Sequence, residues 1–200
     1  MTHARIPLDA RFWSLLQAGD LAQLPGQPAS VLVLHSGLEP AAILALTGRW
    51  RNGEFSQIFS FSHTADTLLQ ALEAWDHASN QWLFIDCISS SVKNPEPKPG
   101  IIFEATPSNA RQLEIILSGH EPREPYRTMA IDSLSALLDG PLAMDASGQA
   151  AIFKELGLLA HGAPGRRLIV FFDERHRDAF TIPLLGFDAI IRVEEISGFG

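Results

Sequence analysis

Short apolar runs alternate along the chain with longer segments of helical periodicity. The runs are too short and too continuous for amphipathic helices, and strands buried on both faces have this pattern. The predicted strands occupy residues 31–34, 55–61, 82–85, 101–103, 129–131, 168–172 and 187–193. The predicted helices occupy residues 41–46, 65–77, 108–119, 133–138 and 149–161. Strands that alternate with helices indicate right-handed βαβ units. The sequence therefore predicts an α/β fold, a three-layer sandwich with a mainly parallel central sheet.

We expect a single domain over residues 1–200, because no internal repeat and no shift in composition marks a boundary. Residues 8–30 are predicted as a leader helix followed by a Gly/Pro loop. Residues 89–100 contain three prolines and are predicted as a mobile Pro-rich surface loop. The helix after the first core strand is expected to stop near Gly48.

Composition narrows the classes of function. The chain is 46% hydrophobic and 19% charged, with a formal net charge of −8 and no basic stripe, which argues against a nucleic-acid partner. No segment approaches the roughly 18 uninterrupted apolar residues of a membrane helix, so we expect no membrane partner. Cys87 is the only cysteine, which excludes an intramolecular disulfide and favours a packed, inert thiol in the cytoplasm.

Aspartates directly follow predicted strands: Asp86 comes after 82–85, and Asp132 comes after 129–131. Asp132 follows the buried run 129–131, and the carboxyl ends of strands are where open α/β sheets bind ligands. A carboxylate there suits a magnesium ion or a water beside a nucleotide. The alternative is that Asp132 caps the turn into residues 133–138 by accepting backbone N–H bonds.

The junction after the first core strand has the wrong chemistry for a phosphate loop. Such a loop needs several glycines, a lysine and a magnesium-binding hydroxyl, whereas Ser36-Gly-Leu-Glu-Pro40 offers only Gly37. Pro40 suits the first position of a helix, and the Glu39 carboxylate complements the positive end of the helix dipole. The same carboxylate would repel a phosphate. The loop therefore argues against the usual mode of triphosphate binding.

Histidines follow two of the predicted strands. His35 and His63 would converge at one sheet edge and, with Asp86 or Asp132, form an acid–base cluster. The alternative is that both are polar residues at loop starts. No His-x-x-x-His spacing occurs, so a metal site is not expected.

The order of these elements resembles a known family. Residues 31–37, 59–61 and 84–87, and above all Ala130-Ile-Asp-Ser-Leu-Ser-Ala136, are similar to the RecA-type ATPase core in its KaiC/GvpD-like branch. In that family the last segment is the Walker B strand, whose aspartate corresponds to Asp132. The Walker A motif has no counterpart here, and Ser62-His63 replaces the catalytic glutamates. The resemblance implies a degenerate member with a vestigial nucleotide crevice at Asp132, Ser133, Ser36 and Gly37.

We therefore expect a pseudo-ATPase: a non-hydrolysing, cytoplasmic regulatory or scaffold subunit that acts through protein–protein interaction. It would have no catalytic residues and no cofactor. By the resemblance, its partners would be copies of itself or RecA-like subunits in a hetero-oligomer. One alternative is an ATP/Mg-binding ATPase or nucleotide sensor with an unconventional phosphate loop, in which Asp86 assists Asp132. Another is a small-ligand sensor that uses the same crevice.

Overall fold

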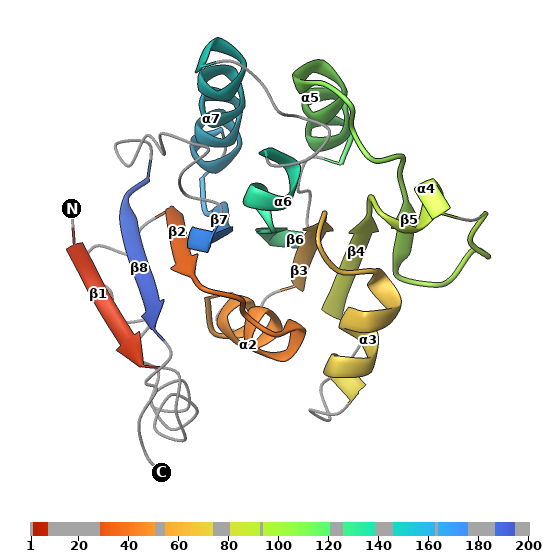
Figure 1. Cartoon of the computed structure of the whole chain (residues 1–200), viewed down its shortest axis with the longest axis horizontal. Coiled ribbons are helices and arrows are strands. Elements are labelled where there is room, and N and C mark those ends of the chain that lie inside the picture. The colour runs from red at the N-terminus through yellow and green to blue at the C-terminus, as the bar shows by residue number, and fades with distance from the viewer. Residues whose placement is uncertain are drawn as a thin grey trace.

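A computed structural model gives the arrangement of the chain (Figure 1). It describes residues 2–7, 29–50, 55–73, 81–92, 94–120, 126–138, 146–162, 164–175 and 187–194. The leader helix predicted over residues 8–30 lies outside the described residues, apart from residues 29 and 30 at its end.

The strands form one eight-stranded sheet in the order β1-β8-β2-β7-β6-β3-β4-β5. Every neighbouring pair runs parallel. The strands are β1 (Thr2–Pro7), β2 (Ser30–His35), β3 (Phe55–Ser60), β4 (Trp82–Asp86), β5 (Ile101–Phe103), β6 (Tyr126–Asp132), β7 (Arg167–Asp173) and β8 (Ala189–Glu194). The predicted α/β class with a parallel sheet is confirmed. Strand β1 was not predicted. Among the described strands it pairs with β8 alone, at the edge of the sheet, and an edge strand does not need a continuous apolar run.

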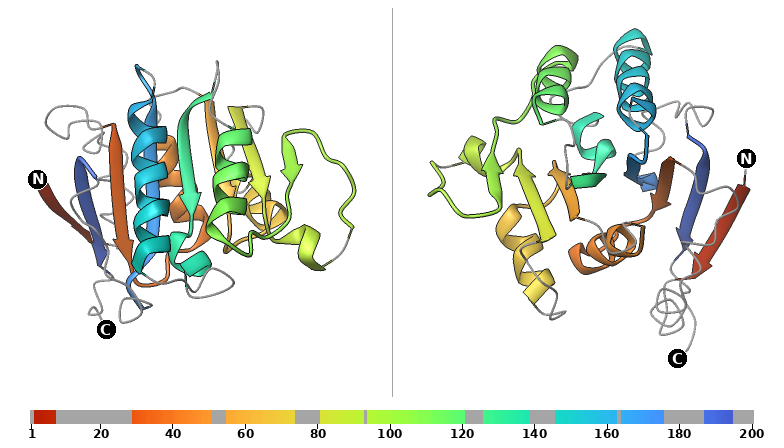
Figure 2. Two further views of the ribbon diagram at one scale, coloured as in Figure 1. Left: turned by 90° about the horizontal axis from the view of Figure 1, so that it is seen from above. Right: turned by 180° about the vertical axis from the view of Figure 1, so that it is seen from behind.

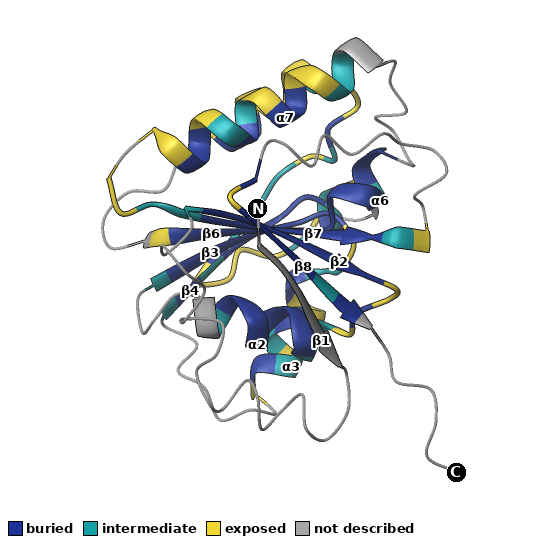
Figure 3. Ribbon diagram, turned by 90° about the vertical axis from the view of Figure 1, so that its left-hand side faces the viewer, coloured by how far each residue is buried: buried dark blue, intermediate teal, exposed yellow. Residues whose placement is uncertain are grey.

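Helices cover both faces of the sheet (Figure 3). They are α2 (Pro40–Trp50), α3 (Ala65–Glu73), α4 (Ser89–Val92), α5 (Ala110–Gly119), α6 (Leu134–Leu138) and α7 (Ala146–His161). Helices α2 and α3 share one core cluster with the sheet, and α5, α6 and α7 share the cluster on the opposite face. The three-layer arrangement predicted from the sequence is therefore present.

Successive side chains of a strand point alternately into these two core clusters. In β2, Val31 and Val33 face α2 and α3, whereas Leu32 and Leu34 face α7, and all four are buried. Full burial of one such side chain is worth about 1.5–3 kcal/mol. Because both faces are covered, the strands read as continuous apolar runs.

Two predicted boundaries differ in the structure. Helix α2 passes through Gly48 and ends at Trp50. A Cβ at Gly48 would lie 3.7 Å from the ring of Trp82, an ordinary van der Waals contact, and this glycine lies inside the helix and does not end it. The segment 89–100 begins with the short helix α4, and residues 94–100 are exposed except for half-buried Pro95. Its mobility stays a prediction.

Among the described connections, those after β3 and β6 mark a place at the carboxyl edge of the sheet. Strand β3 leads into α3 on one face, and its neighbour β6 leads into α6 on the other. Adjacent strands whose connections leave in opposite directions form a topological switch point, where ligands of α/β proteins bind. The ends of β3 and β6 therefore define the candidate site.

Candidate functional site

A row of polar side chains follows the carboxyl edge of the sheet on the side of α2 and α3. Strand register places His35 beside Asp173, Asp132 beside Ser60, and Ser60 beside Asp86. In each strand the residue two positions earlier belongs to the core beneath α2 and α3. Because side chains alternate between the faces of a strand, all five polar residues face that same layer.

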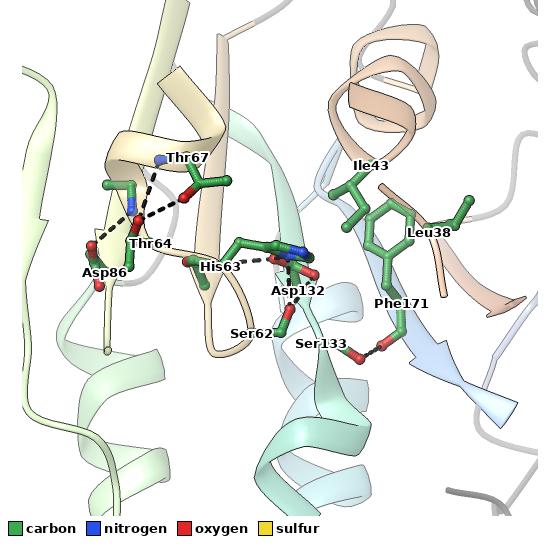
Figure 4. Close-up of polar contacts among 12 residues, drawn as sticks. Leu38, Ile43, Ser62, His63, Thr64, Thr67, Asp86, Asp132, Ser133 and Phe171 are labelled. Atoms are coloured by element: carbon green, nitrogen blue, oxygen red, sulfur yellow. Dashed lines mark hydrogen bonds and ion pairs between the residues drawn. The ribbon is translucent and has the colours of Figure 1, made fainter. Parts of the chain in front are cut away.

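Asp132 is fully buried at the centre of this row (Figure 4). Its Oδ1 accepts a hydrogen bond from the Ser62 hydroxyl at 2.8 Å, and its Oδ2 lies 2.8 Å from Nδ1 of His63. The Ser60 hydroxyl lies 3.3 Å from the same Oδ2. Among the described residues its partners are thus side chains from β3 and the turn after it. Asp132 ties two strands together and does not cap the turn into α6.

His63 favours its charged form. The hydrogen bond from its ring to Asp132, together with the negative charge of that carboxylate, raises the pKa of His63 despite partial burial. Its Nδ1 also lies 3.0 Å from the Ser62 hydroxyl. Because this nitrogen donates to Asp132, it cannot also accept the Ser62 proton, which itself points to Asp132. The three residues therefore form a structural cluster and not a nucleophile–base–acid relay.

Asp86, the second strand-end aspartate, has a different role. Its carboxylate accepts the backbone N–H groups of Ala65, Ile88 and Ser89 at 2.8–2.9 Å and the Ser89 hydroxyl at 2.7 Å. Burial alone would raise its pKa, but these hydrogen bonds lower it overall. Asp86 thus caps α4 and anchors the start of α3, where the Thr64 hydroxyl also accepts the N–H of Thr67. Both oxygens of this carboxylate, which the magnesium hypothesis would use, already accept hydrogen bonds within the protein. The described residues contain no group of three or more His, Cys, Asp or Glu side chains placed to hold a metal ion.

The loop after β2 directs its amides inward. Nδ1 of His35 accepts the N–H of Gly37 at 3.2 Å and that of Leu38 at 3.0 Å. A phosphate loop would present such N–H groups to its ligand. Gly37 has φ of 84°, and a Cβ there would lie 3.1 Å from the guanidinium of Arg175. Arg175 forms a bidentate pair with Asp173, in which Nε donates to Oδ1 and Nη2 donates to Oδ2, so this cation lies over the loop while bound to a carboxylate of the protein.

His35 is itself 4% exposed. Burial lowers the pKa of His35 to about 4, although the nearby carboxylates of Asp173 and Asp132 oppose the shift. Since Nδ1 accepts two N–H groups, the neutral ring carries its proton on Nε2, which has no hydrogen-bond partner in the described part of the chain. The predicted acid–base cluster is therefore divided: His63 binds Asp132, and His35 binds its own loop.

The four predicted crevice residues have different surroundings in the structure. Asp132 lies at the switch point, but the Ser133 hydroxyl bonds to Ser135 at 2.7 Å and to the Phe171 carbonyl at 3.3 Å. Ser36 and Gly37 are exposed on the loop after β2. Sequence reasoning missed Ser60, Ser62, Asp173 and Arg175 as members of the site. The alternation of β3 and β7 could have indicated Ser60 and Asp173, because each lies two positions beyond a core residue.

Cys87 follows Asp86 and is fully buried. Burial, together with the charges of Glu104 and Asp86, raises the pKa of this thiol. The prediction of a packed, inert cysteine is confirmed for its burial. In the described segments no helix has the length and apolar character needed to cross a bilayer. Compared with known proteins, the chain matches no protein-family model and no curated protein.

Proposed function

We propose that this domain is a non-hydrolysing, RecA/KaiC-like pseudo-ATPase that serves as a regulatory or scaffold subunit through protein–protein interaction. Its partners would be copies of itself or RecA-like subunits, and its location would be the cytoplasm. The observation that carries the proposal is the hydrogen bonding of the Gly37 and Leu38 amides to His35. The groups that would bind a phosphate are engaged within the protein.

A bound magnesium nucleotide would have to displace several existing interactions. It would need the two loop amides from His35 and an oxygen of Asp132, which is paired with His63 and Ser62. Leaving a buried donor or acceptor without its partner costs about 1–3 kcal/mol. Several such losses oppose nucleotide binding at this edge.

Side chains that join across the switch point favour a role in assembly over ligand binding there. The switch point between β3 and β6 is the position where α/β sheets hold ligands, yet here protein side chains join across it. A fold alone does not assign a function, so the support comes from this site chemistry. The acidic net charge of −8 also disfavours a polyanionic partner.

The test is a titration with a fluorescent ATP analogue and magnesium. We expect no saturable binding. Saturable binding that Asp132→Ala abolishes, and that Asp66→Ala at an exposed aspartate leaves intact, would contradict the proposal. Light scattering at two protein concentrations tests self-association. A strictly monomeric result would remove the homo-oligomer from the proposal.

A further inference from the structure

Two large apolar side chains are exposed in the described part of the chain. Ile115 on α5 is 59% exposed and Leu158 on α7 is 57% exposed. The two helices lie side by side in the same layer (Figure 2), and exposed residues recur along the outer side of α7 (Figure 3). Ile115 lines a separate hollow beside residues 104–108, whereas Leu158 lines the hollow between α5 and α7, so of these two residues it is Leu158 that bears on that hollow.

Helices α5 and α7 enclose a groove. A hollow of about 350 Å³ lies between them, with Leu113, Leu117 and Ile152 among its lining residues and Leu158 at its exposed side. Two alanines, Ala110 and Ala151, also line the groove, and their small side chains leave its sides low. A third helix could therefore approach both helices and bury Leu158.

Charge distinguishes the possible occupants of this groove. Glu114 on α5 and Glu155 on α7 line it together with Lys154. Neither glutamate forms an ion pair with a residue that the structure describes. Two carboxylates against one ammonium favour an occupant whose flanks carry basic residues.

We propose that the groove between α5 and α7 binds an amphipathic helix of a partner protein, with an apolar stripe flanked by lysine or arginine. The apolar stripe covers Leu158 and the floor of the groove, and the basic flanks pair with Glu114 and Glu155. This is the helix-in-groove mode of recognition, in which apolar anchors recur at helical spacing. The inference rests on the proposal that the domain acts through protein contacts, and it names the chemistry of one partner.

The test uses a fluorescein-labelled synthetic helix of about 20 residues, with leucines on one stripe and lysines on both flanks. Fluorescence anisotropy with the full chain should show saturable binding. We expect Leu158→Ser to weaken it about 10-fold or more, and the double variant Glu114→Lys/Glu155→Lys to do the same. The matched control Glu73→Lys/Glu96→Lys changes two exposed glutamates outside the groove by the same total charge, and it should alter binding less than about 2-fold.

Three outcomes would overturn the inference: no saturable binding, equal weakening in the groove and control variants, or unchanged binding by Leu158→Ser. A fourth outcome, self-association through the groove, is measured by light scattering. If the wild type forms a dimer that Leu158→Ser dissociates, the groove contacts a second copy and not a basic helix. The nucleotide titration is an independent measurement. If the peptide does not bind the groove, the proposed function still stands. If ATP binds, the proposed function is rejected whether or not the peptide binds.

Discussion

The buried imidazole of His35 predicts a loss of stability in mild acid. The folded protein holds this ring neutral, with Nδ1 accepting two amides of the loop. In the unfolded chain the same ring takes up a proton near its ordinary pKa of 6.5, whereas in the fold the pKa is lowered to about 4. The unfolded state therefore binds more protons as the pH falls from 6.5 toward 4, and the folded state is destabilised over that window.

The size of the effect follows from the shift. A difference between 6.5 and about 4 corresponds to about 3 kcal/mol in total. Roughly 2 kcal/mol of it should be lost between about pH 7 and about pH 5. The charged groups around the ring are Asp173, Asp132, Arg175 and His63. His63 acts in the opposite direction, because its raised pKa adds stability as it gains a proton and that stability is lost as the pH rises.

The variant His35→Asn isolates the contribution. Its side-chain oxygen can still accept the amides of Gly37 and Leu38, but it does not titrate. Urea unfolding at both pH values should show that the wild type loses about 2 kcal/mol more than the variant on acidification. His161→Asn, at an exposed position in the last turn of α7, controls for loss of an imidazole. Equal pH dependence in wild type and His35→Asn would refute the assignment of a buried neutral ring.

Two further predictions concern neighbouring positions with opposite expectations. The variant Asp132→Asn should stay folded and lose roughly 1 kcal/mol of unfolding free energy, because Ser62 keeps a hydrogen-bond partner while His63 loses a charged one. The variant Ile131→Asp should unfold the domain, since it buries an unpaired charge. Equal loss of thermal stability in these two variants would show that Asp132 is as essential to the fold as the core. Gly37→Ala should destabilise by about 1 kcal/mol or more because of its positive φ and the guanidinium of Arg175, whereas Gly157→Ala, inside α7 with open space around its Cβ, should be neutral or stabilising by up to about 1 kcal/mol. Urea unfolding checks both glycines, and a stabilised Gly37→Ala would contradict the reasoning.

The strands of the core could be predicted from the sequence because of how they are buried. A strand covered on both faces has to be apolar at consecutive positions, as in Leu168–Phe172, and the β-branched and aromatic residues of this run favour a strand over a buried helix. The edge strand β1 and the end of α2 lack such a signal. Gly48 is of the residue type that usually ends a helix, yet it lies inside α2 near the ring of Trp82, 34 positions later in the chain, and the local sequence does not show that proximity.

The candidate site was predictable only in part, since strand ends can be found from the sequence but strand order cannot. Asp132 and Asp86 were identified because each follows an apolar run. The partner of Asp132 is His63, 69 residues earlier, and the two meet because β6 pairs with β3. Local patterns contain no information on that pairing, so the cluster of Asp132, Ser62 and His63 could not be derived from them.

Asp86 and Asp132 show why a strand-end aspartate does not by itself indicate a nucleotide site. After Asp86 the chain turns back, so that the amides two and three positions later bond to its carboxylate. After Asp132 the chain enters α6 on the opposite face, and the carboxylate bonds to the turn after β3 instead. Both carboxylates are already hydrogen-bonded by side chains or amides of the protein. Whether a nucleotide binds therefore depends on the loop after β2, where His35 accepts the amide N–H groups that a phosphate would need. A nucleotide that bound there would first have to displace this ring.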